Sequence, residues 1–464
     1  MPGAPYRIGL STLVLLTSAG VFSVVNTASL ATDGLALVTY LLLGSLLFLV
    51  PTALVAAELG SRVNKDGGVF AWVDEAFGPR LGAVAQFAQW ASNLPFLPYL
   101  FAFMGSALAY IFHPPLAESR WWIFANILAW IWLTTLANFG GVRNSSRFTT
   151  VTFVVGNLLP AAVLVGLAAW WLARGMPSGV PWNPRSLLPD RSLDQLMILA
   201  AVMLSLMGVD VTAPLVRHVD RPERTFPRGV LITAVLVTIL YVASSLSVAV
   251  LLPSGENALV AGTLMAFQRG FGALGVPWVA KLLAAALCIG ALSVGVVWTL
   301  STARAMMAMA RLQLIPEVFG RTNARDVPTG ALLVQAVLAS LLALPVLFLP
   351  TVGSAFFLSL SVTTQMRLVL YMMEFATFLR LKRRDRPSPT AYTVPGGIVG
   401  AWIVGGIGTL SCLVGIGAGF VPSAAVRAAG FDATLRYWAF IVGTMFVLLV
   451  LPLAYIERRR RGSS

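Results

Sequence analysis

The stretch LSLMGVDVTAPLVRHVDRPERTFPRG, residues 204–229, begins as an apolar helix and loses that character within a few positions. Gly208, Asp210 and Pro214 follow one another closely, and four arginines come after them. Glycine weakens a helix, proline removes a backbone donor, and a carboxylate is costly in lipid. The pattern indicates a membrane helix that breaks inside the bilayer.

Composition places the whole chain in a membrane. Of its 464 residues, 58% are hydrophobic and 11% are charged, which is too apolar for a water-soluble globule. Apolar runs of about 20 residues span a bilayer, and glycine, proline and charge separate such runs here. We predict twelve spans, at residues 8–31, 35–59, 81–112, 121–142, 149–173, 195–216, 229–253, 277–303, 329–350, 353–379, 396–420 and 437–456.

The distribution of basic residues predicts the orientation. The formal net charge is +14, but the cause is an excess of Lys and Arg in the loops of one side, not a surface for nucleic acid. With the N-terminus inside, 23 of the 32 Lys and Arg residues lie in cytoplasmic loops and tails and 7 lie outside. Lys281 and Arg367 fall within spans. We therefore expect a multi-pass protein of the bacterial inner membrane, surrounded by lipid, with both termini cytoplasmic.

Several chemistries are excluded by missing motifs. None of the three lysines follows a glycine, so no phosphate-binding Gly-x-x-x-x-Gly-Lys loop is present. Two histidines and two cysteines, all far apart, give no metal-ligand spacing and no disulfide framework, and we predict neither a metal nor a cofactor. The longest loop, residues 174–194, is too short for a core. We predict one transmembrane domain over residues 1–464 that is not an enzyme.

A second interrupted span occurs in the other half of the chain. In LLTSAGVFSVVNTASLATDG, residues 15–34, the small and hydroxyl residues Thr17, Ser18 and Gly20 fall at mid-membrane and predict an opening of the helix there. Spans 1 and 6 are equivalent if the fold is an inverted repeat of five helices. We predict an all-α membrane protein with repeats at about 8–173 and 195–382, discontinuous helices 1 and 6, and peripheral helices at about 396–457.

A broken helix has a chemical use. The N-terminal end of a half-helix exposes amides, which bind a carboxylate, and the C-terminal end exposes carbonyls, which bind an ammonium group. Two facing breaks can therefore hold an amino acid zwitterion. Kinks that serve packing alone remain the alternative for each segment taken separately.

Longer motifs carry a family resemblance. These are GGVFAWVDEAFGPR (67–80), LLLGSLLFLVPTALVAAELG (41–60), ANFGGVRNSSR (137–147), MGVD with RPERTFP (207–227), STARAMMAMARLQLIPEVFGR (301–321) and YTVPGG (392–397). The chain resembles, nearly end to end, the glutamate:GABA antiporter branch of the amino acid, polyamine and organocation transporter superfamily. That resemblance implies a LeuT-like fold of twelve helices and transport of an amino acid or a related amine.

The resemblance also implies a substrate site. The substrate carboxylate would meet the first break at Ser18, Ala19 and Gly20, and its amino group would meet the carbonyls from Leu204 through Met207 to Gly208. The remaining residues that the family implies are Trp90, Asn93, Trp298 and Tyr371. Helix packing is the alternative for the two tryptophans. Arg367 replaces a tyrosine of the glutamate:GABA exchangers, and Val25 and Asn26 replace an aromatic and an acidic residue, so we expect a retuned pocket.

Charged residues inside spans are costly and need a partner or a cavity. Asp210 is either a gating or proton-sensing carboxylate or a cap for the broken helix. Arg367 either neutralises an acidic substrate or pairs with Glu374. Lys281 and Glu58 lie near span ends and are expected at the interface.

Together these features predict a secondary active amino acid transporter that works by alternating access, as an exchanger or a proton-coupled carrier. The expected substrate is an anionic or zwitterionic amino acid, or its decarboxylated amine. A transporter-fold ligand sensor or accessory subunit is the main alternative, and a membrane-embedded enzyme is the other. The spacing of Gly396 and Gly400 also permits a homodimer.

Overall fold

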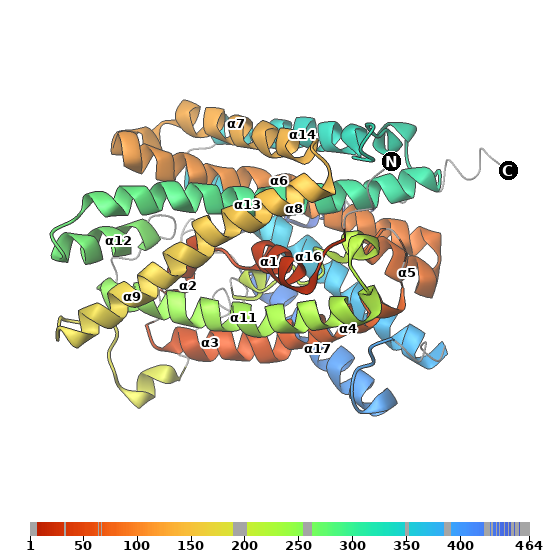
Figure 1. Ribbon diagram of the computed structural model, residues 1–464, viewed down its shortest axis with the longest axis horizontal. Helices are drawn as coiled ribbons and strands as arrows, with labels where there is room; N and C mark the ends of the chain where they lie inside the picture. The colour runs from red at the N-terminus through yellow and green to blue at the C-terminus, as the bar shows by residue number, and fades with distance from the viewer. Residues whose placement is uncertain are drawn as a thin grey trace.

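The computed structural model describes residues 7–31, 34–63, 65, 67–188, 202–253, 262–348, 352–384 and 391–421, with scattered positions between 427 and 454. Within this part of the chain the regular structure is helical, apart from one bridge between Ile8 and Val219 (Figure 1). At that bridge the Ile8 amide donates to the His218 carbonyl at 2.7 Å and the Asp220 amide donates to the Ile8 carbonyl at 2.9 Å. The segments at the start of span 1 and the end of span 6 are thereby joined.

The described helices follow the predicted spans. In chain order they are α1 (Leu10–Val21), η1 (Val24–Asn26) and α2 (Thr27–Leu30) for span 1; α3 (Ala36–Gly44), η3 (Ser45–Leu49) and α4 (Val50–Arg62) for span 2; α6 (Pro79–Phe112) and α7 (Arg120–Asn138) for spans 3 and 4; α8 (Val142–Phe153), η5 (Val154–Leu158) and α9 (Leu159–Ala173) for span 5; η7 (Ala213–His218) at the end of span 6; α11 (Pro222–Leu251) and α13 (Trp278–Arg311) for spans 7 and 8; α14 (Thr329–Leu342) and α15 (Pro345–Phe348) for span 9; and α16 (Val352–Arg384) and α17 (Gly397–Gly419) for spans 10 and 11. Connecting segments form α5 (Val69–Phe77), η4 (Pro114–Glu118), η6 (Pro184–Leu187), α12 (Gly262–Ala273) and η8 (Glu317–Gly320).

Length and composition agree with the membrane prediction. Seven helical stretches of the described residues are long and apolar enough to cross a bilayer, and the apolar stretch Leu10–Asn26 is shorter. The stretches for spans 4 and 10 run for 19 and 33 residues. Residues 195–201 of span 6 and half of span 12 lie outside the described residues.

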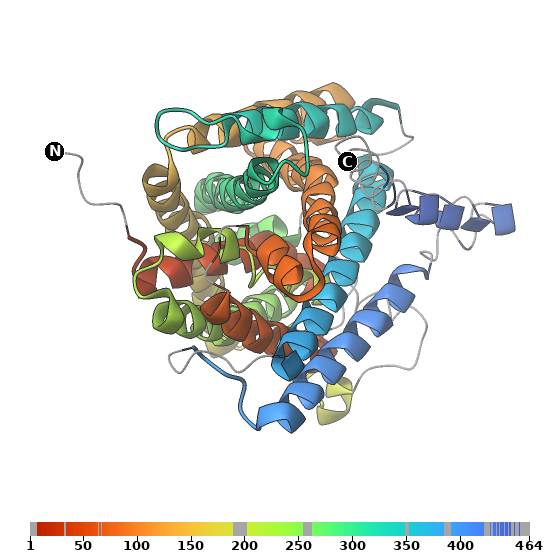
Figure 2. The same cartoon turned by 90° about the vertical axis from the view of Figure 1, so that its right-hand side faces the viewer.

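The interrupted first span occupies the middle of the bundle. In Figure 1, α1 lies between α11 on one side and α13 on the other, and it packs against both and against α8. Helix α17 runs beside α16 at the edge of the bundle in Figure 2, and only 22% of its most apolar window is buried, as a peripheral helix requires. Gly396 and Gly400 lie in the turn that starts α17, where the Gly400 amide donates to the Gly396 carbonyl at 3.0 Å.

Two spans contain a wide π-turn, and proline explains both. Pro51 follows η3 and Pro160 follows η5. Because proline has no amide hydrogen, it leaves the carbonyl four residues earlier without its helical donor. For Pro51 that carbonyl belongs to Leu47, and Ser411 of α17 donates to it at 2.7 Å. The widened turn thus receives a hydrogen bond from the peripheral helix.

Candidate functional site

The first helix opens after Val21. The next two residues are extended, and η1 and α2 then continue the span. Tyr241 of α11 bridges the gap, because its hydroxyl donates to the Val21 carbonyl at 2.8 Å and accepts from the Ser23 amide at 3.3 Å. The Val24 amide donates to Asn157 Oδ1 at 3.2 Å. Side chains from two neighbouring spans therefore hold the backbone groups that the break releases.

The predicted position of this opening, at Ser18 to Gly20, is wrong. The helix continues through these residues, and the Phe22 amide donates to the Ser18 carbonyl at 2.7 Å to complete its last turn. Small residues here allow close packing and do not unwind the backbone, since a side chain on Gly20 would collide with Val211. Ser18, Ala19 and Gly20 are fully buried and lie at the C-terminal, carbonyl-bearing end of α1.

The second break begins after Ser205, where the described helical part of span 6 ends. Gly208 has φ +117°, a backbone conformation that strongly favours glycine. Its amide donates to the Tyr371 hydroxyl at 2.8 Å, and that hydroxyl donates to Asp210 Oδ1 at 2.7 Å. Gln89 of α6 donates to the other carboxylate oxygen at 3.0 Å. The span then continues as the 3₁₀-helix η7.

The two breaks face each other across a short distance. A Cβ atom on Gly208 would lie 2.8 Å from the Gly20 carbonyl oxygen and 2.9 Å from Trp298 Cζ2. Trp298 of α13 donates from its indole nitrogen to the same Gly20 oxygen at 3.0 Å. Ser301, one turn further along α13, donates to the Val211 carbonyl at 2.5 Å. The discontinuous helices 1 and 6 predicted from the sequence are confirmed, and α13 contacts both breaks.

Arg367 of α16 lies beside this junction and is 4% exposed. Its guanidinium carbon lies 3.8 Å from the centre of the Trp298 ring and 4.9 Å from that of Phe96. Both Nε and Nη2 are buried and have no hydrogen-bond partner among the described residues. Arg367 and Glu374 form no ion pair, so the alternative in which they neutralise each other directly is wrong. The arginine instead presents free donors next to the two breaks.

The other predicted residues divide into two groups. Leu204 and Met207 lie at the end of the described helical part of span 6, where the Met207 amide still donates to the Leu204 carbonyl at 3.2 Å. Asn93 donates to Thr302 of α13 at 3.3 Å, one turn beyond Trp298. Trp90 packs edge-on against Phe319 in a separate cluster of buried side chains. The structure thus does not bring Trp90 to the breaks.

Sequence reasoning missed Gln89, Tyr241 and Phe96. Each lies on a long helix away from the two breaks, and only Phe96 has helix-disturbing neighbours, Pro95 and Pro98. A buried amide on an otherwise apolar helix is the one available signal, and it applies to Gln89. Among the described residues, no group of three His, Cys, Asp or Glu side chains could hold a metal ion.

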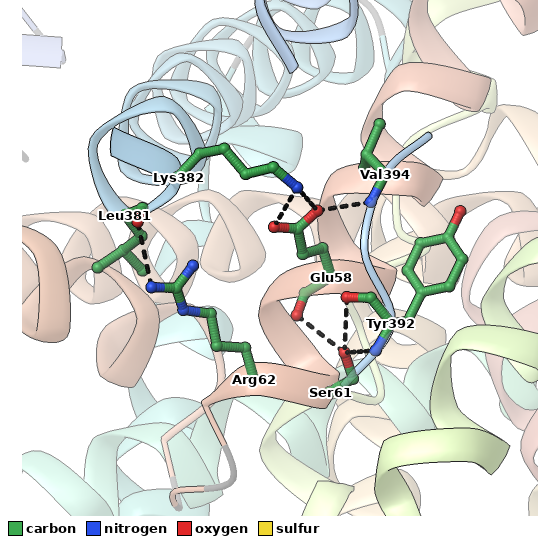
Figure 3. A network of polar contacts seen from close by, with 7 residues as sticks. All are labelled: Glu58, Ser61, Arg62, Leu381, Lys382, Tyr392 and Val394. Atoms are coloured by element: carbon green, nitrogen blue, oxygen red, sulfur yellow. Dashed lines mark hydrogen bonds and ion pairs between the residues drawn. The ribbon is translucent and has the colours of Figure 1, made fainter. Parts of the chain in front are cut away.

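A second polar cluster lies away from the junction, where α4 and α16 end (Figure 3). Lys382 donates to both oxygens of Glu58, at 3.0 and 2.8 Å, and the Val394 amide donates to Glu58 Oε2 at 2.6 Å. Glu58 is 1% exposed and lies near the end of α4, so protein and not solvent surrounds its carboxylate. Ser61 accepts from the Tyr392 amide at 3.1 Å and completes the connection. We call Glu58, Lys382 and Val394 the cytoplasmic clasp, after the predicted orientation.

Known proteins that are similar to this chain include amino acid transporters. A family model described as amino acid permease matches residues 8–448. The chain belongs to the amino acid permease family. It is 29% identical over 469 residues to a glutamate/gamma-aminobutyrate antiporter of Lactococcus lactis, covering 98% of this chain and 92% of the relative. It is 28% identical to an uncharacterized transporter of Legionella pneumophila, covering 97% of each.

A solved structure supports the same fold. MhsT in complex with L-phenylalanine superposes with a TM-score of 0.63 at 16% identity, covering 90% of this chain and 100% of that one. This permease therefore has the LeuT-like fold, is a multi-pass membrane protein, and is a secondary active transporter of amino acids. Its relatives are transporters, and a small-molecule substrate follows from the family.

Proposed function

We propose that this permease moves an acidic amino acid, held with one carboxylate against Arg367 and its α-amino group at the junction of the two breaks. The observation that carries the proposal is the buried guanidinium with free Nε and Nη2 donors. Buried donors without acceptors are costly, and a substrate carboxylate supplies the missing acceptors together with a negative charge. Stacking on Trp298 and Phe96 fixes the plane in which the donors point.

The broken helices supply the complementary half of the site. Ser18, Ala19 and Gly20 lie at the carbonyl end of α1, and Leu204 and Met207 lie at the carbonyl end of the described helix of span 6. Both ends favour a positive group, so the substrate ammonium belongs there. The α-carboxylate therefore does not belong at Ser18, Ala19 and Gly20, where the family resemblance implied it, whereas the amino group keeps the place implied for it near Leu204 and Met207. Asn93, Trp298 and Tyr371 are proposed to line the same site.

Asp210 is proposed as a gate between the site and the cytoplasm. Its carboxylate connects the second break to α16 through Tyr371 and to α6 through Gln89. Loss of its charge weakens both hydrogen bonds together, so protonation releases the break from two helices at once. We further propose exchange of the acidic substrate for its decarboxylated amine or for a second amino acid, in the bacterial inner membrane with both termini cytoplasmic. The name of the Lactococcus lactis relative supports exchange.

Counterflow tests this proposal. Proteoliposomes loaded with an unlabelled acidic amino acid are expected to accumulate the labelled compound, and neutral or basic amino acids should compete poorly. Arg367→Met should weaken acidic-substrate binding by at least about 10- to 150-fold, because each hydrogen bond that the guanidinium donates to a carboxylate contributes about 1.5–3 kcal/mol.

Lys281→Met is the matched control, since Lys281 is an exposed cation at the far end of α13 from Trp298. The affinity of the Lys281→Met variant for the acidic substrate should equal that of the natural chain. No counterflow with any amino acid would reject transport by exchange. Unchanged affinity in Arg367→Met would remove that arginine from the site. Ligand binding without counterflow would favour a sensor on the same fold.

A further inference from the structure

Glu374 is a buried acidic residue on the α16 face that also carries Arg367 and Tyr371. Glu374 is 1% exposed, and its Oε1 is buried without a hydrogen-bond partner. No described cation lies within ion-pair distance of it. An ionised carboxylate in such surroundings is expensive, whereas the neutral acid is not. The environment therefore stabilises the protonated form.

Asp210 is also a buried acidic residue, and its hydrogen bonding differs from that of Glu374. Both of its oxygens accept hydrogen bonds, from Tyr371 and Gln89, and Arg367 interacts with it electrostatically. These contacts hold the carboxylate to α16 and α6. Two carboxyl groups thus lie near one another, one with a donor to each oxygen and one with a buried oxygen that has no described donor. Protonation of Asp210 would weaken two hydrogen bonds, whereas protonation of Glu374 would break none among the described residues, so the two groups suit different tasks.

Charged groups on the helices packed against α16 could compensate a charge on Glu374. Those helices are α17, α6, α5, α4 and α15, and the last of these, Pro345–Phe348, has no titratable side chain. Asp210 and Tyr371 interact with Glu374 electrostatically from the junction, and Cys412 does so from α17. On α6, Gln89 is neutral and donates to Asp210, and on α4 Glu58 is already paired with Lys382. Acidic Asp74 and Glu75 of α5 lie beyond the clasp, near Arg384. No neighbour described here neutralises Glu374.

The position of Glu374 along α16 shows which groups lie on either side of it. Tyr371 precedes Glu374 by one turn, about 4.5 Å of rise, and Lys382 follows it by about 12 Å. Lys382 belongs to the cytoplasmic clasp that Figure 3 shows. Along α16, Glu374 therefore lies between the junction of the two breaks and the clasp. A proton held there is close to the substrate on one side and to the proposed cytoplasmic opening on the other.

We propose that Glu374 is the proton carrier of this transporter: it takes up one proton while the site is open to one side and releases it to the other side after the substrate has moved. Only one O–H bond forms and later breaks. This inference rests on the proposed acidic substrate, because an incoming anion adds negative charge beside Asp210, and a proton on Glu374 compensates for it. Substrate binding and proton binding are coupled because each stabilises the other.

The experiment measures substrate and proton movement in the same proteoliposomes. An acidic exterior should drive uptake of the labelled acidic amino acid. It should also lower the pH of the liposome interior, which an enclosed pH-sensitive dye reports. Glu374→Gln keeps the shape of the neutral acid, so it should fold and retain counterflow at equal pH. Its gradient-driven uptake and dye signal should fall to the level of protein-free liposomes. Thr377→Val is the matched control, because Thr377 is a buried, unpartnered polar residue one turn away on α16, and it should keep both signals.

A second measurement does not depend on transport. Infrared spectra of the natural chain should contain a carbonyl stretch of a protonated carboxylic acid, which disappears in Glu374→Gln and shifts in Glu374→Asp. Gradient-driven uptake that survives in Glu374→Gln, uptake without proton entry in the natural chain, or an infrared band that does not respond to either substitution would overturn the inference. Failure of counterflow in the natural chain would instead reject the proposed exchange.

Discussion

Replacing Lys382 by Met is expected to lower the free energy of unfolding by about 3–5 kcal/mol, because it leaves a buried carboxylate without its countercharge. Side-chain exposure is 1% for Glu58 and 10% for Lys382, so water cannot replace the lost ammonium group. The Val394 amide remains, at 2.6 Å from Glu58 Oε2. One neutral donor offsets only about 0.5–1.5 kcal/mol of the loss.

A double-mutant cycle separates the ion pair from general packing. When Glu58→Gln is combined with Lys382→Met, the side-chain amide oxygen of the new glutamine still accepts from Val394, and the new methionine fills the volume of the lysine stem. The double variant should lose only about 1 kcal/mol, since removing both charges of a buried pair is often nearly neutral. The two substitutions should therefore be non-additive by at least about 2 kcal/mol.

The matched control is Lys65→Met. Lys65 pairs with Glu75 at 2.5 Å, but the two side chains are 61% and 36% exposed. An exposed pair contributes about 0–1 kcal/mol, so this control should change little. Unfolding is followed by tryptophan fluorescence as the SDS fraction of mixed micelles rises. If Lys382→Met is no less stable than Lys65→Met, or if the cycle is additive, the clasp does not hold α4 to α16.

Two further predictions concern the junction of the breaks. Gly208→Ala should destabilise the protein by about 2–5 kcal/mol and reduce counterflow, because the new side chain combines a strained positive φ with collisions against Gly20 and Trp298. Gly166→Ala is its control, because no atom lies within 4 Å of the new Cβ at that helical site. This control should be neutral or slightly stabilising in the same unfolding assay. Asp210→Asn should flatten the pH dependence of the counterflow rate, since the gate loses its titrating group, and an unaltered profile would reduce Asp210 to a cap.

Local signals in the sequence are sufficient to place the second break. Gly208, Asp210 and Pro214 disturb a helix wherever it packs, and the second break begins just before them. The first break was misplaced by about one turn, because Gly20 serves close contact with Val211 and leaves its own helix intact. Residue type reports that a small side chain is needed, but not whether packing or unwinding needs it.

Partners distant in sequence could not be predicted. Glu58 and Lys382 are separated by 324 positions, and Val21 and Tyr241 by 220. Helical periodicity gives the spacing along one helix, but not the rotation of that helix relative to its neighbours. Arg367 and Glu374 illustrate the limit, because they share a face of α16 and yet contact different surroundings.

The strengths of these contacts indicate where the molecule can open. A buried ion pair joins α4 to α16, and paired backbone hydrogen bonds join the start of α1 to the end of η7. The contacts from α6 and α13 to the two breaks are single hydrogen bonds: Gln89 to Asp210, Trp298 to Gly20 and Ser301 to Val211. Hydrogen bonds of this kind contribute about 0.5–3 kcal/mol each, and water replaces them as the interface opens. Alternating access is therefore expected to break these three hydrogen bonds, while the clasp keeps α4 with the adjoining end of α16 and the backbone pair keeps the start of α1 with the end of η7.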